Sequence, residues 1–198
     1  IPYPIFAFCA LLPWQLFAYA LSESSNSLVT NKNLVTRVYF PRLVIPLAAT
    51  LSGLVDFAIS LVFFVGLMAW FHVVPTWNVL ALPLLVAFAL LTALAVGLWL
   101  SALNVQYRDV RYTLPFLTQL WLFATPIAYP SSLVPEPWRP FFGLNPMAGV
   151  VEGFRWALLG TAQPPLGLMA VSVVVVIVLF FGGVAYFRRM ERTFADTL

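Results

Sequence analysis

The chain contains very little charge for its length. Only 9% of its 198 residues are Asp, Glu, Lys or Arg, whereas 62% are hydrophobic, and the mean hydropathy is +0.96. Soluble proteins are about 45–50% apolar, and a chain of this size leaves roughly 30% of its unfolded surface exposed after folding. Because so much apolar surface could not be hidden from water, the composition predicts that most of the protein is embedded in lipid.

Residues that could form disulfides, bind metals or nucleotides, or act in catalysis are also scarce. Cys9 is the one cysteine, so neither an intrachain disulfide nor a thiolate metal cluster can form within the chain. The one histidine, His72, lies at the end of an apolar run, which favours an ordinary interfacial histidine over a metal ligand. No G-x-x-x-x-G-K-[ST] surrounds the sole lysine, Lys32, which excludes a P-loop. No Ser/His/Asp grouping is present either, so the sequence predicts no catalytic residue, no metal site and no cofactor on this chain.

Long apolar runs dominate what remains. A membrane-spanning helix needs about 20 apolar residues, because it crosses about 30 Å of hydrocarbon at about 1.5 Å per residue. The ten-residue alternating segments of a transmembrane β-barrel do not occur, since the runs are apolar on all sides. The sequence therefore predicts an all-α polytopic membrane protein with five transmembrane helices, at residues 3–21, 43–71, 79–103, 112–130 and 165–187.

Basic residues are concentrated in alternate loops. Eight of the ten Lys and Arg residues lie in three of the predicted loops, and the other two, Arg139 and Arg155, lie on the opposite side. Positive charge in short loops marks the cytoplasmic side. We therefore expect residues 22–42, 104–111 and the C-terminal 188–198 to be cytoplasmic, and the long segment 131–164 to lie outside.

Five spans place the two ends of the chain on opposite sides of the membrane. The chain begins at Ile1, which is already apolar, and the first run has neither a basic n-region nor a small-residue cleavage site. It therefore does not resemble a signal peptide. We expect a further N-terminal helix in the complete protein.

The outer segment around 125–160 is rich in proline and in aromatic residues, so it cannot form one continuous helix. From Met147 onward, apolar residues recur at helical spacing, and Glu152 and Arg155 can pair on the other face because they are three positions apart. This pattern predicts a short re-entrant or interfacial helix at, or dipping into, the outer leaflet. Irregular backbone at membrane depth needs cover by protein or by a water-filled cavity, which indicates a pore mouth.

Asp56 is the only charged residue inside a predicted span. A carboxylate in that position costs about 2.5–3.5 kcal/mol on insertion scales. It either faces a conduit or is hydrogen-bonded within the helix bundle, and the residues alone do not separate these interpretations.

Two further groups of residues have both an ordinary and a functional interpretation. The basic residues of the cytoplasmic loops either anchor the helices by snorkelling or dock a cytoplasmic partner. The outer aromatic residues either form an interfacial belt or stack on a sugar ring. Taken alone, the residues favour the ordinary interpretation in both cases.

Three ordered segments resemble a known family. They are "NLVTRVYFPRLVIPLAATLSGLVDFAISL" (33–61), "ALNVQYRDVRYTLPFLTQLWLFATPIAYP" (102–130) and "LNPMAGVVEGFRWALLG" (144–160). Together they resemble the permease subunits of ABC-2 type polysaccharide exporters, which export O-antigen, capsule and teichoic acid. "LLPWQLFAYAL" (11–21) is similar to the second membrane helix of that family. Members have six membrane helices and begin with an amphipathic helix and a first membrane helix, both absent here.

The resemblance implies a transport subunit, not an enzyme. It implies a homodimer bound to two ATP-binding cassette ATPase subunits, which hold ATP and Mg²⁺, in the inner membrane of a bacterium. The substrate would be a lipid-linked glycan, with no role for nucleic acid. An ABC-2 drug or lipid exporter remains an alternative, as does a passive channel. A membrane glycosyltransferase is disfavoured, because the acidic residues of the outer loops, Glu136 and Glu152, both lie near arginines.

The resemblance also assigns roles to residues. It favours coupling to the ATPase over mere anchoring for Lys32, Arg37, Arg42, Tyr107, Arg108, Asp109 and Arg111. It makes a translocation path or outer gate a second interpretation, beside the belt, for Trp121, Phe123, Tyr129, Trp138, Phe141 and Phe142.

Overall fold

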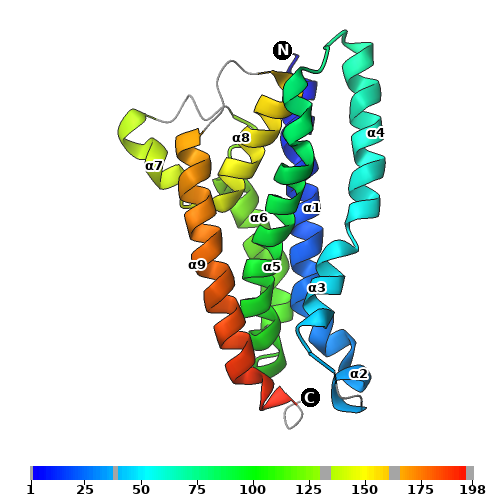
Figure 1. The fold of residues 1–198 in the computed structure, drawn as a ribbon, viewed down its shortest axis with the longest axis vertical. Helices are drawn as coiled ribbons and strands as arrows, with labels where there is room; N and C mark the ends of the chain where they lie inside the picture. Colours follow the sequence, from blue (N-terminus) through cyan, green and yellow to red (C-terminus); the bar gives the residue numbers. More distant parts are fainter. Residues whose placement is uncertain (1, 38–39, 130–134, 161–165, 195–198) are drawn as a thin grey trace.

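The computed structural model describes residues 2–37, 40–129, 135–160 and 166–194 (Figure 1). Every regular element in these ranges is helical, which confirms the all-α prediction. The elements are α1 (Tyr3–Thr30), α2 (Lys32–Arg37), α3 (Val44–Leu51), α4 (Leu54–Trp70), the 3₁₀ helix η1 (Trp77–Ala81), α5 (Leu82–Gln106), α6 (Val110–Ala124), the 3₁₀ helix η3 (Glu136–Trp138), α7 (Arg139–Phe142), α8 (Pro146–Leu159) and α9 (Leu166–Glu191).

Four helical segments of the described chain are long and apolar enough to cross a membrane. They are Tyr3–Thr30, Val44–Trp70, Trp77–Gln106 and Leu166–Glu191, each with 26 to 30 residues. At about 1.5 Å per residue each is longer than the hydrocarbon layer of about 30 Å. These four correspond to four of the five predicted spans, and the protein is a multi-pass membrane protein.

The fifth predicted span, 112–130, differs from the structure. Its helix, α6, has only 15 residues, which is about 22 Å long and too short to cross the hydrocarbon layer alone. Thr125 is already extended, with φ −98° and ψ 138°, because the following proline, Pro126, disfavours helical backbone at the residue before it. Bent backbone continues to Tyr129, and residue 130 lies outside the described part.

The predicted loop 22–42 is wrong over its first nine residues, since α1 continues to Thr30. Polar side chains there bond inside the helix: the Ser25 hydroxyl donates to the Leu21 carbonyl at 2.6 Å. Asn104 of α5 also donates to the Ser25 carbonyl at 3.0 Å and to the side-chain oxygen of Asn26 at 3.1 Å. The serines and asparagines that suggested a loop thus serve as packing contacts between α1 and α5.

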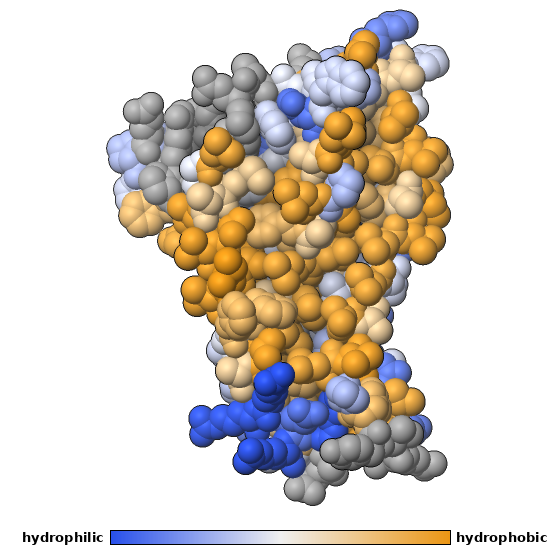
Figure 2. Space-filling view, in the orientation of Figure 1, coloured by the Kyte–Doolittle hydropathy of each residue, from blue (hydrophilic) through white to orange (hydrophobic). Residues whose placement is uncertain are grey.

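Helix α5 lies between α1 and α9 and forms the centre of the bundle, whereas α4 lies at its edge (Figure 1). Close approach of α1 and α5 depends on Gly97, because a Cβ there would lie 2.4 Å from the Ser24 hydroxyl oxygen. A larger buried cluster joins α1, α4, α5 and α8, and a smaller one joins the ends of α1, α5 and α9 near the C-terminus. Figure 2 shows an apolar surface over the middle of the molecule and hydrophilic residues at the end near the C-terminus.

Helix α8 corresponds to the predicted short outer helix, but it does not lie on a surface. Almost all of its residues are buried, and it packs against α1, α5 and α9 at the end of the bundle opposite the C-terminus (Figure 1). A Cβ at Gly149 would lie 2.5 Å from the Ser172 hydroxyl of α9, and one at Gly153 would lie 2.7 Å from Leu85 of α5. These glycines let α8 enter between the long helices. Residues 131–134 and 161–164 of the predicted outer segment lie outside the described part.

Candidate functional site

Residues 107–109 form a tight turn between α5 and α6, and Arg111 follows in the first turn of α6. The Tyr107 amide donates to the Leu103 carbonyl at 2.7 Å and closes α5, and the Val110 amide donates to the Tyr107 carbonyl at 3.2 Å. The side chains of Tyr107, Arg108, Asp109 and Arg111 are all exposed. The turn therefore presents its charges at the end of the bundle near the C-terminus.

Lys32 joins this turn in space, although it is more than 70 positions away in sequence. A hollow of about 290 Å³ is lined by Lys32, Arg108, Arg111 and Tyr112, with Val29, Asn104 and Val105 beneath them. Three cationic side chains around one hollow create a positive potential that attracts acidic groups. The structure thus brings together three of the seven residues that the sequence predicts to couple to an ATPase.

The other predicted coupling residues are placed differently. The Arg42 guanidinium donates to the Glu191 carbonyl at 2.5 Å, where a cation stabilises the C-terminal end of α9. Tyr107 and Asp109 are in the turn but do not line the hollow. The side chain of Arg37 lies outside the described part, so its role stays a prediction.

At the opposite end of the bundle, Arg155 of α8 is almost completely buried, with 1% of its side chain exposed. It pairs with Glu152 at 2.9 Å and donates to the Ile127 carbonyl at 2.7 Å. Its guanidinium carbon lies 3.8 Å from the centre of the Phe6 ring of α1, a favourable cation–π arrangement. Arg155 therefore connects α8, the bent segment 125–129 and the start of α1. The sequence predicts its pairing with Glu152 but not its burial.

Asn145 is a second polar residue that holds this end together, and sequence reasoning missed it. Its side-chain oxygen accepts hydrogen bonds from the Trp121 indole at 2.8 Å and from the Met147 amide at 3.1 Å. Its side-chain amide donates to the Thr125 hydroxyl at 3.0 Å. Asn145 is thus both the N-cap of α8 and the residue that fixes the end of α6. An Asn followed by Pro146 at the start of an apolar helical pattern is the signal that could have identified it.

The six outer aromatic residues do not form one cluster. Trp121 packs edge-on against Phe17 of α1, with ring centres 5.0 Å apart. Tyr129 contacts Phe142, and Trp138 contacts Phe141. Phe123 is exposed on α6. Trp121 is therefore bound into the bundle, and a path or gate role for all six residues stays a prediction.

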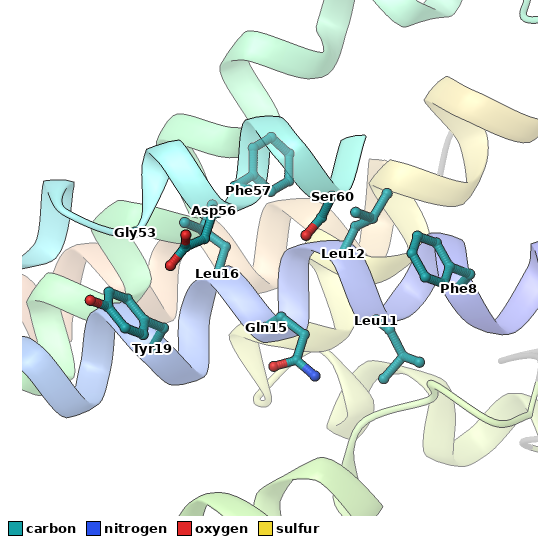
Figure 3. A pocket seen from close by; sticks show the side chains of 10 residues that line it. All are labelled: Phe8, Leu11, Leu12, Gln15, Leu16, Tyr19, Gly53, Asp56, Phe57 and Ser60. Carbon is teal, nitrogen blue, oxygen red and sulfur yellow. The ribbon is translucent and has the colours of Figure 1, made fainter. Parts of the chain in front are cut away.

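Asp56 is exposed in the first turn of α4 and lines a pocket of about 360 Å³ between α4 and α1 (Figure 3). No arginine, lysine or histidine lines this pocket. Across the described ranges, no group of three His, Cys, Asp or Glu residues is placed to hold a metal ion.

Comparison with known proteins agrees with this architecture. A family model described as "ABC-2 type transporter" matches residues 4–159. The chain is 32% identical to the "O-antigen export system permease protein RfbA" of Myxococcus xanthus, over 99% of the chain and 76% of that protein. It is 26% identical to the protein of the same name in Klebsiella pneumoniae, over 99% and 76%. It is 23% identical to the "Polysialic acid transport protein KpsM" of Escherichia coli, over 96% and 75%.

Proposed function

Because the chain belongs to the ABC-2 type transporter family, we propose that it is the permease subunit of an ATP-driven exporter of lipid-linked polysaccharide. The similarity to O-antigen and polysialic acid export proteins over nearly the whole chain carries this proposal. The four long apolar helices support it, since a conducting subunit must cross the membrane several times. The membrane is the cytoplasmic membrane of a bacterium, with the C-terminus inside.

The energy for export comes from separate ATPase subunits that hold ATP and Mg²⁺. The absence of a P-loop from this sequence supports a second chain. The hollow lined by Lys32, Arg108 and Arg111 is the surface we assign to that ATPase. A positive surface matches an acidic partner and fixes its orientation. Two permeases and two ATPases form the working assembly.

Movement reaches the outer end through rigid helices. The turn 107–109 is continuous with α5, and α5 packs against α8 through Leu85 and Gly153. Packed helices shift between discrete arrangements and do not deform continuously. When the ATPases close on ATP, a displaced turn would therefore move α5 and, with it, the α8 end that Arg155 and Asn145 hold.

Complementation and purification test this function directly. The gene is deleted and the full-length protein is returned with an affinity tag. We expect surface polysaccharide to disappear and then return, and an ATP-binding cassette subunit to co-purify from the membrane. Unchanged surface polysaccharide after deletion, or purification without an ATPase, would contradict the proposal.

Reversing the charge of the hollow tests the coupling surface. The double variant Arg108→Glu with Arg111→Glu should lower export at least five-fold and reduce the amount of co-purifying ATPase, because acidic groups of the partner would be repelled. The level of folded permease in the membrane should change little, since both side chains are exposed. Export is measured as surface polysaccharide in the deletion strain.

The matched control is Arg188→Glu with Arg189→Glu in the last turn of α9. These arginines are also exposed and basic, and lie at the same end of the bundle, but they do not line the hollow. Equal losses of export in both double variants would mean that general positive charge matters and that the hollow has no specific role.

Cysteine labelling tests the orientation. In a Cys9→Ala background, a cysteine at Trp77, which is 88% exposed, should react with a membrane-impermeant maleimide added to intact cells. A cysteine at Tyr107, which is 57% exposed at the opposite end, should react only after the cells are opened. The reverse pattern would overturn the assignment of the inner side.

A further inference from the structure

The pocket between α1 and α4 carries polar side chains at a depth where the protein should be apolar. Asp56 is the thirteenth of the 27 residues of the span Val44–Trp70, and Gln15 is the thirteenth of the 28 residues of α1. Both therefore lie near the middle of their spans, and both are exposed. Because a charge facing lipid there costs about 2.5–3.5 kcal/mol, this face is covered by something that accepts and donates hydrogen bonds.

The helix is interrupted for two residues beside the same pocket. Helix α3 ends at Leu51 and α4 begins at Leu54, with Ser52 and Gly53 between them. Gly53 lines the pocket, and a Cβ there would lie 2.8 Å from the Tyr19 ring. The interruption is a kink and not an unwound segment, because Ser52 and Gly53 keep right-handed helical dihedral angles. Without a side chain at Gly53, α4 approaches the Tyr19 ring of α1 at the pocket.

The lining residues restrict what can bind. Asp56, Gln15, Tyr19 and Ser60 provide a carboxylate, an amide, a phenol and a hydroxyl, and Phe8 lies at the end of the pocket away from Tyr19 (Figure 3). Figure 3 shows the Asp56 carboxylate pointing from α4 toward Tyr19 of α1. No cationic residue lines the pocket, which argues against a phosphate or diphosphate, and one carboxylate alone is a poor site for a divalent ion.

A hydroxyl-rich neutral ring fits this set. Its hydroxyl groups can donate to the carboxylate and to the amide oxygen and accept from the phenol. The volume of about 360 Å³ is at the lower end of the range for small-ligand sites, about 300–1,000 Å³. Such contacts are weak and numerous, which suits a passing substrate, because a tightly held one would not leave.

We infer that this pocket is a contact site for a sugar residue of the exported glycan, with Asp56 and Gln15 as its main hydrogen-bonding groups. The inference rests on the proposed function and names a place where the substrate touches this chain. It assigns Asp56 to the conduit and not to a purely structural role.

Photocrosslinking tests the inference in the complete exporter. The photoreactive residue benzoylphenylalanine replaces Gln15 in the full-length protein, in cells that make the lipid-linked glycan and in cells that do not. We expect a glycan-dependent adduct, detected with an antibody against the polysaccharide. The control position is Val62 of α4, which is 71% exposed and does not line the pocket, and it should give no such adduct.

Other adducts would overturn the inference. An adduct at position 15 with a second copy of the chain, with another segment of the protein or with phospholipid alone would show that this other group covers the pocket. The absence of a glycan adduct while the variant still exports would also overturn it. Loss of the proposed function is recognised separately, because the unmodified protein would then fail to restore surface polysaccharide.

Substitutions provide a second readout. Asp56→Leu with Gln15→Leu should slow export at least three-fold, whereas Asp56→Asn, which keeps a hydrogen-bonding group of the same shape, should retain most of it. ATPase co-purification should stay constant in both variants, which separates a path defect from a coupling defect. Normal export by the double leucine variant would contradict the inference.

Discussion

Replacing Arg155 with methionine is expected to destabilise the folded protein by about 3–5 kcal/mol, because removal of one member of a buried ion pair leaves the other uncompensated. Glu152 would lose its partner at 2.9 Å, with 16% of its side chain exposed, and the Ile127 carbonyl would lose its donor. Since folded proteins are stable by only about 5–15 kcal/mol, much of the variant should fail to accumulate. Thermal unfolding in detergent and the amount of protein in the membrane are the measurements.

Two further variants separate charge from geometry. In Arg155→Met with Glu152→Leu, no charge remains unpaired, so most of the lost stability should return. Arg155→Lys keeps the charge but lacks the planar fork that bonds a carboxylate and a carbonyl together while it stacks on Phe6. It should therefore be intermediate. If Arg155→Met were as stable as the unchanged protein, the pair would not hold α8 in place.

The pairing of Glu152 with Arg155 could be predicted from the sequence, whereas their burial could not. Spacing of three positions on a helix brings two side chains together whatever surrounds them. Burial depends on Phe6, Ile127 and the rest of the bundle, which are far away in sequence and meet α8 only in the fold. A local pattern contains no information on such covering residues.

Helix boundaries show the same limit. Average hydropathy predicts α9 and α5 to within four residues at each end, because each contains a long apolar window. It places the end of α6 too late, because Pro126 ends the helix within a run that is still apolar. It places the end of α1 too early, because the polar side chains from Ser24 to Ser27 are directed at α5 and at their own helix. In both cases one specific interaction, and not the average hydropathy, determines where the helix ends.

The proximity of Lys32 to Arg108 and Arg111 could be predicted only in part from the sequence. Charge counts place their loops on one side of the membrane, but a common hollow depends on α1 continuing to Thr30 beside the end of α5. The part of α1 that lies within the predicted loop 22–42 therefore brings Lys32 to the turn. The structure thus brings three of the seven predicted residues together and supplies the reason for their proximity, and their coupling role stays a prediction.

Replacing Asn145 with leucine is expected to destabilise the protein at the end of the bundle that contains α8 by about 2–4 kcal/mol. Each buried group left without its partner costs about 1–3 kcal/mol, and loss of an N-cap costs about 0.5–2 kcal/mol. Here the Trp121 indole loses its acceptor at 2.8 Å, and the Met147 amide loses its acceptor at 3.1 Å. Trp121 fluorescence and thermal unfolding, measured in a variant whose other tryptophans are replaced by phenylalanine, report the change.

Asn145→Asp is the matched control for this prediction. Aspartate keeps both acceptor functions and is an equally good N-cap, but it cannot donate to the Thr125 hydroxyl or to the Ala124 carbonyl. The indole contact and the start of α8 should therefore survive, while the link to the end of α6 weakens. We expect Asn145→Asp to retain most of its stability but to export more slowly, because the Trp121 indole still links α8 to α6 while the bonds to Thr125 and Ala124 are lost. Equal stability of the leucine and aspartate variants would show that the capping bonds contribute nothing, and normal export by the aspartate variant would show that the bonds to Thr125 and Ala124 are not needed for transport.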